Sequence, residues 1–182
     1  MTPRWPPCLL VLLALTGCYP DLSGSLDPGP EPPADDALLL DATDYDLWVS
    51  LDLDTTTQGD ATGADWDLAA RRYEIKLNGG VSGDGGVEVQ EVDPDTVVDP
   101  AALPEDGWRS DEGDADDDGV PEYALLDWYD YDYDTHELSP AERRWVVRTT
   151  EGAFFELGFE SYYDAAGTPA RIRLDALRLE TP

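Results

Sequence analysis

An acidic stretch at residues 114–122 has the spacing of a calcium-binding loop. Its three alternate aspartates are followed by Gly119, as in the D-x-D-x-D-G start of such loops. Alternate carboxylates converge on a hard cation, the glycine permits a sharp turn, and the next residue adds a backbone carbonyl. Leu125 stands where an EF-hand has its acidic twelfth residue, so we expect a shorter loop in which Glu122 or Asp127 takes that role. The predicted Ca²⁺ ligands are Asp114, Asp116, Asp118, Val120 and Glu122.

The surroundings of Cys18 predict covalent modification. A positively charged residue and an apolar stretch at residues 8–15 precede it, as in a secretory signal. That stretch is shorter than the roughly 20 apolar residues of a transmembrane helix. The sequence Leu-Thr-Gly-Cys resembles the lipobox of bacterial lipoproteins, whose cysteine receives a diacylglycerol before cleavage on its N-terminal side. We therefore predict a signal peptide at residues 1–17 and a lipid on Cys18 that anchors the chain to a membrane. By resemblance to bacterial sorting, Tyr19 at the next position favours the outer membrane.

Composition limits the partners of the protein. The chain has 11 Lys and Arg residues against 41 Asp and Glu residues, a formal net charge of -30. Such a charge repels nucleic acids and anionic headgroups and attracts cations. The acidity also leaves open a plain alternative for residues 114–122, a solvated acidic loop. No nucleophile–histidine–acid arrangement, phosphate-binding loop or zinc motif is visible, so we do not expect an enzyme.

Most of the chain alternates apolar and polar residues with a period of two, which predicts strands bounded by Gly, Pro and Asp clusters. A Pro- and Gly-rich tether at residues 18–37 precedes one domain at residues 38–182. Residues 149–152 predict a hairpin turn, residues 93–122 an irregular excursion, and residues 140–144 a single helical turn. The fold class is therefore all-β, a single antiparallel domain. The predicted strands are 46–55, 73–77, 87–92, 123–133, 145–149, 154–159 and 171–179.

A more specific pattern, Trp-Asp-Leu-Ala followed by Arg-Tyr and Asn-Gly-Gly, lies in residues 65–80, and a Gly-rich turn follows at residues 82–86. This segment resembles the HmuY family, haem-binding lipoproteins best known from anaerobic Bacteroidetes. Residues 41–48, 128–140 and 146–164 also look like parts of that family, so the resemblance covers most of the predicted domain. It implies an all-β fold in which long hairpins grip haem at one end. It also implies a haemophore role, in which haem is captured and passed to an outer-membrane receptor.

The haem ligands of this family are only partly present. The best-studied member ligates iron with two histidines, and some relatives use methionines. In this chain the single histidine is His136, and the single methionine is Met1 of the predicted signal peptide. The choices left are His136 alone, His136 with a tyrosine oxygen, which is an accepted haem ligand, or contact without axial ligation. The tyrosines nearby in sequence are Tyr129, Tyr131 and Tyr133, and the arginines available to the propionates are Arg71, Arg72, Arg143, Arg144 and Arg148.

Two functions follow from these observations. The first is a lipoprotein of the HmuY type that binds haem or porphyrin for iron acquisition. The alternative is a ligand-diverged, calcium-stabilised β lipoprotein that binds another protein or ligand without haem. The two functions differ in whether the protein responds to haemin.

Overall fold

The computed structural model describes residues 37–180. The predicted signal peptide, Cys18 and the tether up to residue 36 lie outside the described residues, as do residues 181 and 182. The described chain consists of antiparallel strands and two single-turn 3-10 segments, which confirms the all-β prediction. Within residues 37–180 no helix has the length and apolarity needed to cross a bilayer.

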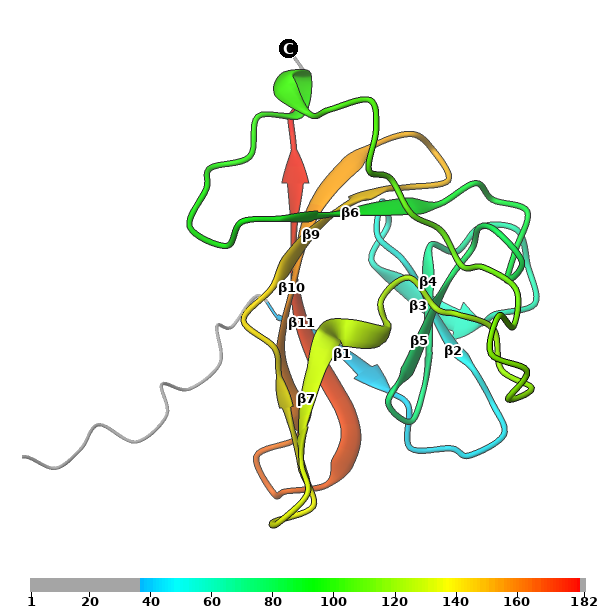
Figure 1. Ribbon diagram of the computed structural model, residues 1–182, viewed down its shortest axis with the longest axis vertical. Helices are drawn as coiled ribbons and strands as arrows, with labels where there is room; N and C mark the ends of the chain where they lie inside the picture. Colours follow the sequence, from blue (N-terminus) through cyan, green and yellow to red (C-terminus); the bar gives the residue numbers. More distant parts are fainter. Residues whose placement is uncertain (1–36, 181–182) are drawn as a thin grey trace, which may run out of the picture. The chain divides into compact units, whose positions relative to one another are not determined.

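A five-stranded antiparallel sheet forms one side of the domain, with the strand order β1-β11-β10-β9-β6. Its two long strands, β10 and β11, pair along most of their length, and the register shifts between Phe159 and Tyr163. Figure 1 shows this sheet on the left of the view, with β10 and β11 running from top to bottom. The strands are β1 (Leu38–Asp41), β6 (Glu88–Val92), β9 (Arg144–Arg148), β10 (Phe154–Tyr163) and β11 (Pro169–Leu179).

A four-stranded antiparallel sheet packs against the first one, with the order β3-β2-β4-β5. A separate hairpin, β7–β8, extends beyond both sheets toward the lower end in Figure 1. The strands of the second sheet are β2 (Val49–Asp52), β3 (Thr57–Asp60), β4 (Leu68–Arg71) and β5 (Glu74–Leu77), and those of the hairpin are β7 (Tyr129–Asp132) and β8 (Glu137–Pro140).

The core lies where the inward faces of the sheets meet. Along β11 the residues Ala170, Ile172 and Leu174 are fully buried and alternate with more exposed ones, as expected for a sheet with one covered face. Two tryptophans fill the centre: Trp128 packs against Phe159 with ring centroids 4.8 Å apart, and Trp145 contacts the same ring at 5.7 Å. Aromatic side chains of this size bury enough apolar area to dominate a small core.

The strand predicted at residues 123–133 is only partly correct. Residues Leu126–Trp128 form a 3-10 turn, and the strand begins at Tyr129. The 3-10 turn places Leu125 and Trp128 on one side, because residues three apart eclipse in that helix, and both are fully buried. The single helical turn predicted at residues 140–144 is wrong, since this segment joins the end of β8 to the start of β9.

Four strands were not predicted, β1, β3, β4 and β8. The first three lack the alternating pattern, and β8 alternates over only four residues. β1 is a run of leucines, the edge strand β3 is exposed at every position, and β4 is buried along Leu68, Ala69 and Ala70 as the central partner of β2 and β5. The hairpin turn predicted at residues 149–152 is present, where the Gly152 amide donates to the Thr149 carbonyl at 2.9 Å.

The irregular residues 93–122 are tied to the sheets by the buried side chain of Asp111. Its Oδ2 accepts from the Leu77 amide at 2.9 Å, and its Oδ1 accepts from the Ala124 amide at 3.0 Å. Isolated bridges between Val89 and Arg109 and between Glu112 and Glu122 lie in the second half of the same segment. The excursion is therefore anchored at its C-terminal end, next to the predicted calcium loop.

Candidate functional site

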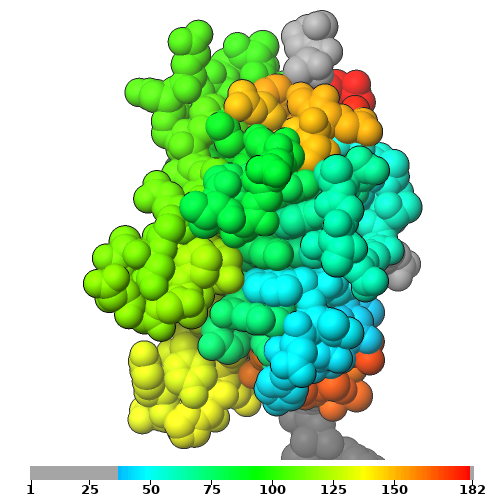
Figure 2. Space-filling model, turned by 90° about the vertical axis from the view of Figure 1, so that its right-hand side faces the viewer, coloured from blue at the N-terminus to red at the C-terminus, as the bar shows by residue number. Residues whose placement is uncertain are grey.

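A surface cavity of about 510 Å³ lies at the end of the domain where three segments come together. These are the β4–β5 turn, the loop after β1 and the last residues of β10. We call this surface cavity the Tyr–Arg cavity. Figure 2 shows the corresponding segments meeting in the lower half of the view, with the β7–β8 hairpin in yellow beside them. Its volume falls within the roughly 300–1,000 Å³ of ligand-binding clefts. The lining residues are Tyr45, Arg71, Arg72, Tyr73, Glu74 and Tyr162.

The β4–β5 turn presents two of these residues, Arg72 and Tyr73. Arg72 adopts a left-handed conformation with φ 56°, which L-residues other than Gly, Asn and Asp rarely adopt. On either side of the turn, Arg71 and Glu74 are paired in register, and the Arg71 Nη2 lies 2.7 Å from the Glu74 Oε2. This pair closes the turn and leaves the positive charge of Arg71 largely neutralised.

Arg72 holds the loop after β1 in place. Its Nη1 donates to the Thr43 carbonyl at 3.0 Å, and its guanidinium lies over the ring of Tyr45, 4.4 Å from the centroid. In residues 37–180 the structure shows no ion pair for Arg72 (the ion pairs involve other arginines), so its charge faces the cavity without a carboxylate partner. A positive group of this kind suits a ligand that carries carboxylates.

Aromatic packing connects the cavity to the hairpin. The indole Nε1 of Trp128 donates to the Tyr73 carbonyl at 2.8 Å, and the ring of Tyr129 meets that of Tyr73 edge to face at 5.8 Å. Burial raises the pKa of Tyr129, and the neighbouring Tyr73 and Glu74 raise it further. Burial also raises the pKa of Tyr162, although Arg72 opposes this. Both phenols therefore stay protonated and serve as apolar surface and hydrogen-bond donors, not as phenolates.

The single histidine lies at the tip of the β7–β8 hairpin. The Oη of Tyr131 and the Nδ1 of His136 are 2.8 Å apart, and the ring of Tyr133 meets that of Tyr131 edge to face at 5.0 Å. When Nδ1 donates its hydrogen to the tyrosine oxygen, Nε2 keeps a lone pair that can bind a metal. His136 has φ 62°, and the tip is well exposed, with Tyr133 82% accessible.

The structure thus separates the predicted haem residues into two groups. Tyr131, Tyr133 and His136 come together at the hairpin tip, and Tyr129 lies further in, against the cavity. Sequence analysis missed Tyr45, Tyr73 and Tyr162 as lining residues. All three lie in segments that resemble the family, but each lies on a different segment, so the sequence did not show that they come together.

Of the five predicted propionate partners, only Arg71 and Arg72 line the cavity. The other three belong to the β9 region and are paired with acidic residues there. Arg143 contacts Glu91 and Asp127, Arg144 contacts Glu156 and Asp175, and Arg148 contacts Glu88.

The predicted calcium loop forms a tight acidic turn on the surface. One carboxylate oxygen each from Asp114, Asp116 and Glu122 lies within 4.8 Å of the others. The Asp118 amide donates to both Asp114 and Asp116, and the Asp118 carboxylate accepts from the Val120 amide at 2.8 Å. Three of the five predicted ligands therefore converge, whereas the Asp118 carboxylate is turned to the Val120 amide.

The packed antiparallel sheets define the class of protein: an all-β domain with a ligand-sized cavity, partly lined by tyrosines, at one end. The model of the HmuY protein family matches residues 44–175, and the chain belongs to this family. The resemblance of residues 65–80 is thereby confirmed.

Solved structures share the fold. A Bacteroides fragilis protein assigned as a lipoprotein is 22% identical with a TM-score of 0.56, and the match covers 84% of this chain and 96% of that one. A protein from Bacteroides vulgatus, assigned as HmuY-like and haem-binding, is 20% identical with a TM-score of 0.57, covering 78% of this chain and 90% of that one. The apo form of a Tannerella forsythia HmuY analogue is 14% identical with a TM-score of 0.59, covering 80% and 95%. No curated protein matches the chain.

Proposed function

We propose that this chain is an extracytoplasmic, lipid-anchored protein that binds haem or a related porphyrin at the Tyr–Arg cavity for iron acquisition. The observation that carries the proposal is the cavity itself, where three tyrosines surround a guanidinium that has no ion pair in residues 37–180. Membership of the HmuY family and the haem-binding assignment of the Bacteroides vulgatus relative support it.

The residues present suit one porphyrin. Flat aromatic faces from Tyr45, Tyr73 and Tyr162 provide apolar contact, and Arg72 provides a positive charge for the propionates. Bound haem would supply an iron that accepts axial ligands, and His136 is our candidate through its Nε2. Tyr131 positions the imidazole, and Tyr131 or Tyr133 can offer an oxygen from the same tip. The raised pKa of Tyr129 disfavours its phenolate, so Tyr129 is proposed as a contact residue.

A haemin titration tests the proposal. The chain from residue 18 onward, with Cys18→Ser, would be titrated with haemin in oxidised and reduced form and followed by absorbance. We expect a saturable Soret shift at one haemin per chain. In His136→Asn the affinity should fall and the spectrum should change, because asparagine tolerates the left-handed backbone but offers no imidazole. Asp117→Asn, at another exposed left-handed residue, is the matched control. An unchanged haemin spectrum with no quenching of tryptophan fluorescence would refute haem binding.

The membrane anchor is proposed on Cys18, in the outer membrane, with residues 1–17 removed. The lipobox-like sequence supports it, and the Bacteroides fragilis structure assigned as a lipoprotein is consistent with it. In a bacterial host we expect the intact chain in the membrane fraction and Cys18→Ser in the soluble periplasmic fraction. Equal membrane association of the two chains would contradict lipidation. An outer-membrane receptor is the proposed recipient of the haem.

A calcium-stabilised surface module without haem is the second candidate. It is favoured by the convergence of Asp114, Asp116 and Glu122 within 4.8 Å. If this loop binds Ca²⁺, the melting temperature should rise with CaCl₂ and fall with chelator, because the ion binds only the folded state. Asp116→Asn should reduce the rise, and NaCl at matched ionic strength should not reproduce it. A melting temperature that millimolar Ca²⁺ leaves unchanged would remove this candidate.

A further inference from the structure

A second group of carboxylates lies where the two sheets meet, away from the surface loop. Asp52 ends β2, Asp54 lies in the β2–β3 turn, and Asp67 directly precedes β4. One carboxylate oxygen of each lies within 4.8 Å of the other two. We call these three residues the aspartate cluster, in which Asp67 is buried and Asp52 and Asp54, taken as whole residues, are partly exposed.

The cluster connects the two sheets through Asp67. Its Oδ2 accepts from the Leu53 amide of the β2–β3 turn at 2.9 Å, and its Oδ1 accepts from the Thr150 amide of the β9–β10 turn at 2.8 Å. Because β10 begins after that turn and reaches Tyr162 near its other end, the cluster is remote from the Tyr–Arg cavity. A ligand here would therefore act on the junction of the sheets and not on the proposed haem site.

The charge of the cluster is poorly compensated. Asp67 is completely buried, and the side chain of Asp54 is only 3% exposed. The ion pair at the cluster joins the Arg178 Nη1 to the Asp54 Oδ1 at 3.0 Å, and the Arg178 side chain is 53% exposed. A single guanidinium that is half in water does not neutralise three carboxylates in a partly buried setting.

One oxygen of the cluster has no partner. Both oxygens of Asp52 accept hydrogen bonds from Thr55, at 3.1 Å from its amide and 2.7 Å from its hydroxyl. Both oxygens of Asp67 accept from backbone amides. The Oδ2 of Asp54, in contrast, is buried and has no hydrogen-bond partner within the described part of the chain. Buried polar atoms are almost always satisfied, so this oxygen is available to a ligand.

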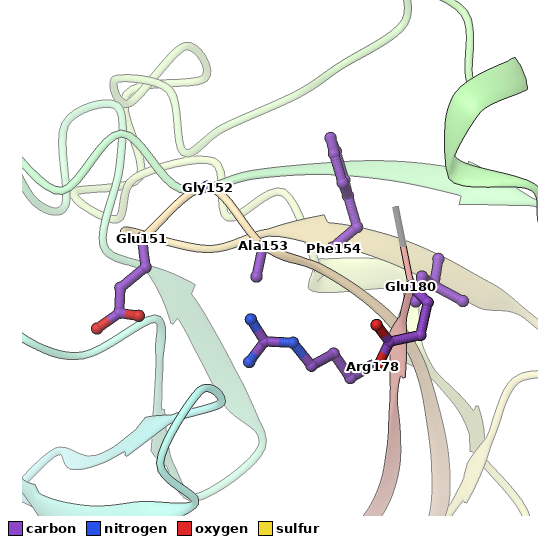
Figure 3. Close-up of a pocket in the computed structure, with 7 residues that line it drawn as sticks. Glu151, Gly152, Ala153, Phe154, Arg178 and Glu180 are labelled. Atoms are coloured by element: carbon purple, nitrogen blue, oxygen red, sulfur yellow. The ribbon is translucent and has the colours of Figure 1, made fainter. Parts of the chain in front are cut away.

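A surface cavity is lined in part by Arg178, the ion-pair partner of Asp54. This cavity of about 260 Å³ is lined by residues 151–154 and residues 178–180. Figure 3 shows the guanidinium of Arg178 reaching into the space beneath the Glu151–Ala153 turn, with the carboxylate of Glu151 on its far side. Since Arg178 also contacts Asp54, the cavity adjoins the cluster, and Arg178 stands between the two.

We propose that Asp52, Asp54 and Asp67 bind one Ca²⁺ ion, which clamps the β2–β3 turn onto the β9–β10 turn. Carboxylate oxygens are the ligands that hard cations prefer, and water completes the coordination. Ca²⁺ takes ligands at about 2.3–2.6 Å in flexible geometry, so oxygens up to roughly 5 Å apart can share one ion. Mg²⁺ demands tighter octahedral geometry and is the poorer fit. This site is independent of both the haem site and the 114–122 loop.

The test requires a chain in which the surface loop is silenced. The parent is the chain from residue 18 onward carrying Cys18→Ser, Asp114→Asn and Asp116→Asn. Calcium binding is measured by calorimetry, and thermal unfolding is followed in CaCl₂, in EDTA and in NaCl at matched ionic strength. We expect one Ca²⁺ per chain and a melting temperature that rises in CaCl₂ alone. NaCl is the essential control, since any cation screens a chain with a net charge of -30.

Asp54→Asn distinguishes a cation ligand from a structural residue. We expect calcium affinity to fall at least tenfold and the calcium-dependent rise in melting temperature to disappear. In EDTA the variant should melt at the same temperature as the parent or higher, because one negative charge has been removed from a cluster that is poorly compensated. A residue with a purely structural role would instead lower the melting temperature under all three conditions.

Arg178→Gln gives a result in the opposite direction. Removing the positive charge beside Asp54 should tighten calcium binding severalfold, because the ion no longer competes with the guanidinium. Three results would overturn the proposal: no calcium binding by the parent, unchanged binding by Asp54→Asn, or an equal response to NaCl. If calcium binds only when Asp114 and Asp116 are intact, the loop alone is a site and the cluster is not.

Discussion

The side chain of Asp111 offers the sharpest test of how the irregular segment is held. It is 2% exposed, and it accepts hydrogen bonds from the amides of Leu77 and Ala124. Asp111→Ala would leave both buried amides without an acceptor. Each unsatisfied donor costs about 1–3 kcal/mol, so the free energy of unfolding should fall by about 2–6 kcal/mol. This is a large part of the roughly 5–15 kcal/mol that stabilises a typical domain.

The pH dependence of this loss has a definite sign. Burial raises the pKa of Asp111 above its ordinary value of 3.8, and the hydrogen bonds to the carboxylate only partly oppose this. The folded carboxyl therefore binds its proton more tightly than the unfolded one. Its contribution to the free energy of unfolding is fully present below pH 3.8 and declines as the pH rises through the folded pKa. The difference between wild type and Asp111→Asn should accordingly be larger near pH 3 than near pH 7.

Urea unfolding followed by tryptophan fluorescence would measure both effects. Asp130→Ala, at an exposed position of β7, is the matched control and should change stability by less than about 0.5 kcal/mol. A loss below about 1 kcal/mol in Asp111→Ala would refute the hydrogen-bonding role. A difference between wild type and Asp111→Asn that grows toward neutral pH would refute the inferred effect of burial on the pKa.

Three further predictions concern the cavity and its supports. Gly80→Ala should lower the free energy of unfolding by about 3 kcal/mol or more in urea. Gly80 has φ 57°, and the new Cβ would overlap the Asp111 carbonyl oxygen. A variant as stable as the wild type would show that this backbone can move. Trp128→Phe should cost about 2–4 kcal/mol, since it empties core volume and removes the 2.8 Å hydrogen bond to the Tyr73 carbonyl; calorimetry checks the value, and a neutral effect would contradict the central role of the indole. Arg72→Gln should weaken haemin binding in the absorbance titration severalfold, whereas Arg143→Gln, whose guanidinium is paired with Glu91, should not; equal affinities for both variants would argue against a role of Arg72 in holding the propionates.

Much of the fold could be predicted because strand alternation is a local property. The alternation in residues 87–92 and 171–179 corresponds to β6 and β11, and the turn at residues 149–152 was found from its residue types. For β3, β4 and the segment before Tyr129, prediction failed because burial does not alternate there, whereas β8 alternates over only four residues and was also missed. β4 is covered on both sides, β3 is exposed on both, and the 3-10 turn before Tyr129 buries residues three apart.

The candidate site could be predicted only in part. From residue types, the sequence indicated haem ligands around His136 and calcium ligands in residues 114–122. In the structure Tyr131 contacts His136, and the carboxylates of Asp114 and Glu122 lie close together. For the cavity only Arg71 and Arg72 carried a signal, because the tyrosines that line it come from segments that are far apart in the sequence.

By itself the sequence determined the family, the all-β class, the strong negative charge and the presence of a single histidine. These are properties of composition and of short patterns. Only the tertiary structure decided which arginine faces the cavity without an ion pair, and which aspartate keeps a buried oxygen without a partner. Arg71 and Arg72 are neighbours in sequence, yet within residues 37–180 only Arg71 has an ion pair. Asp52 and Asp54 are two residues apart, yet only Asp54 has a buried oxygen without a partner in the described residues. The physical reason is that burial and pairing depend on contacts with distant strands, such as those of Arg178 with Asp54 and of Thr150 with Asp67.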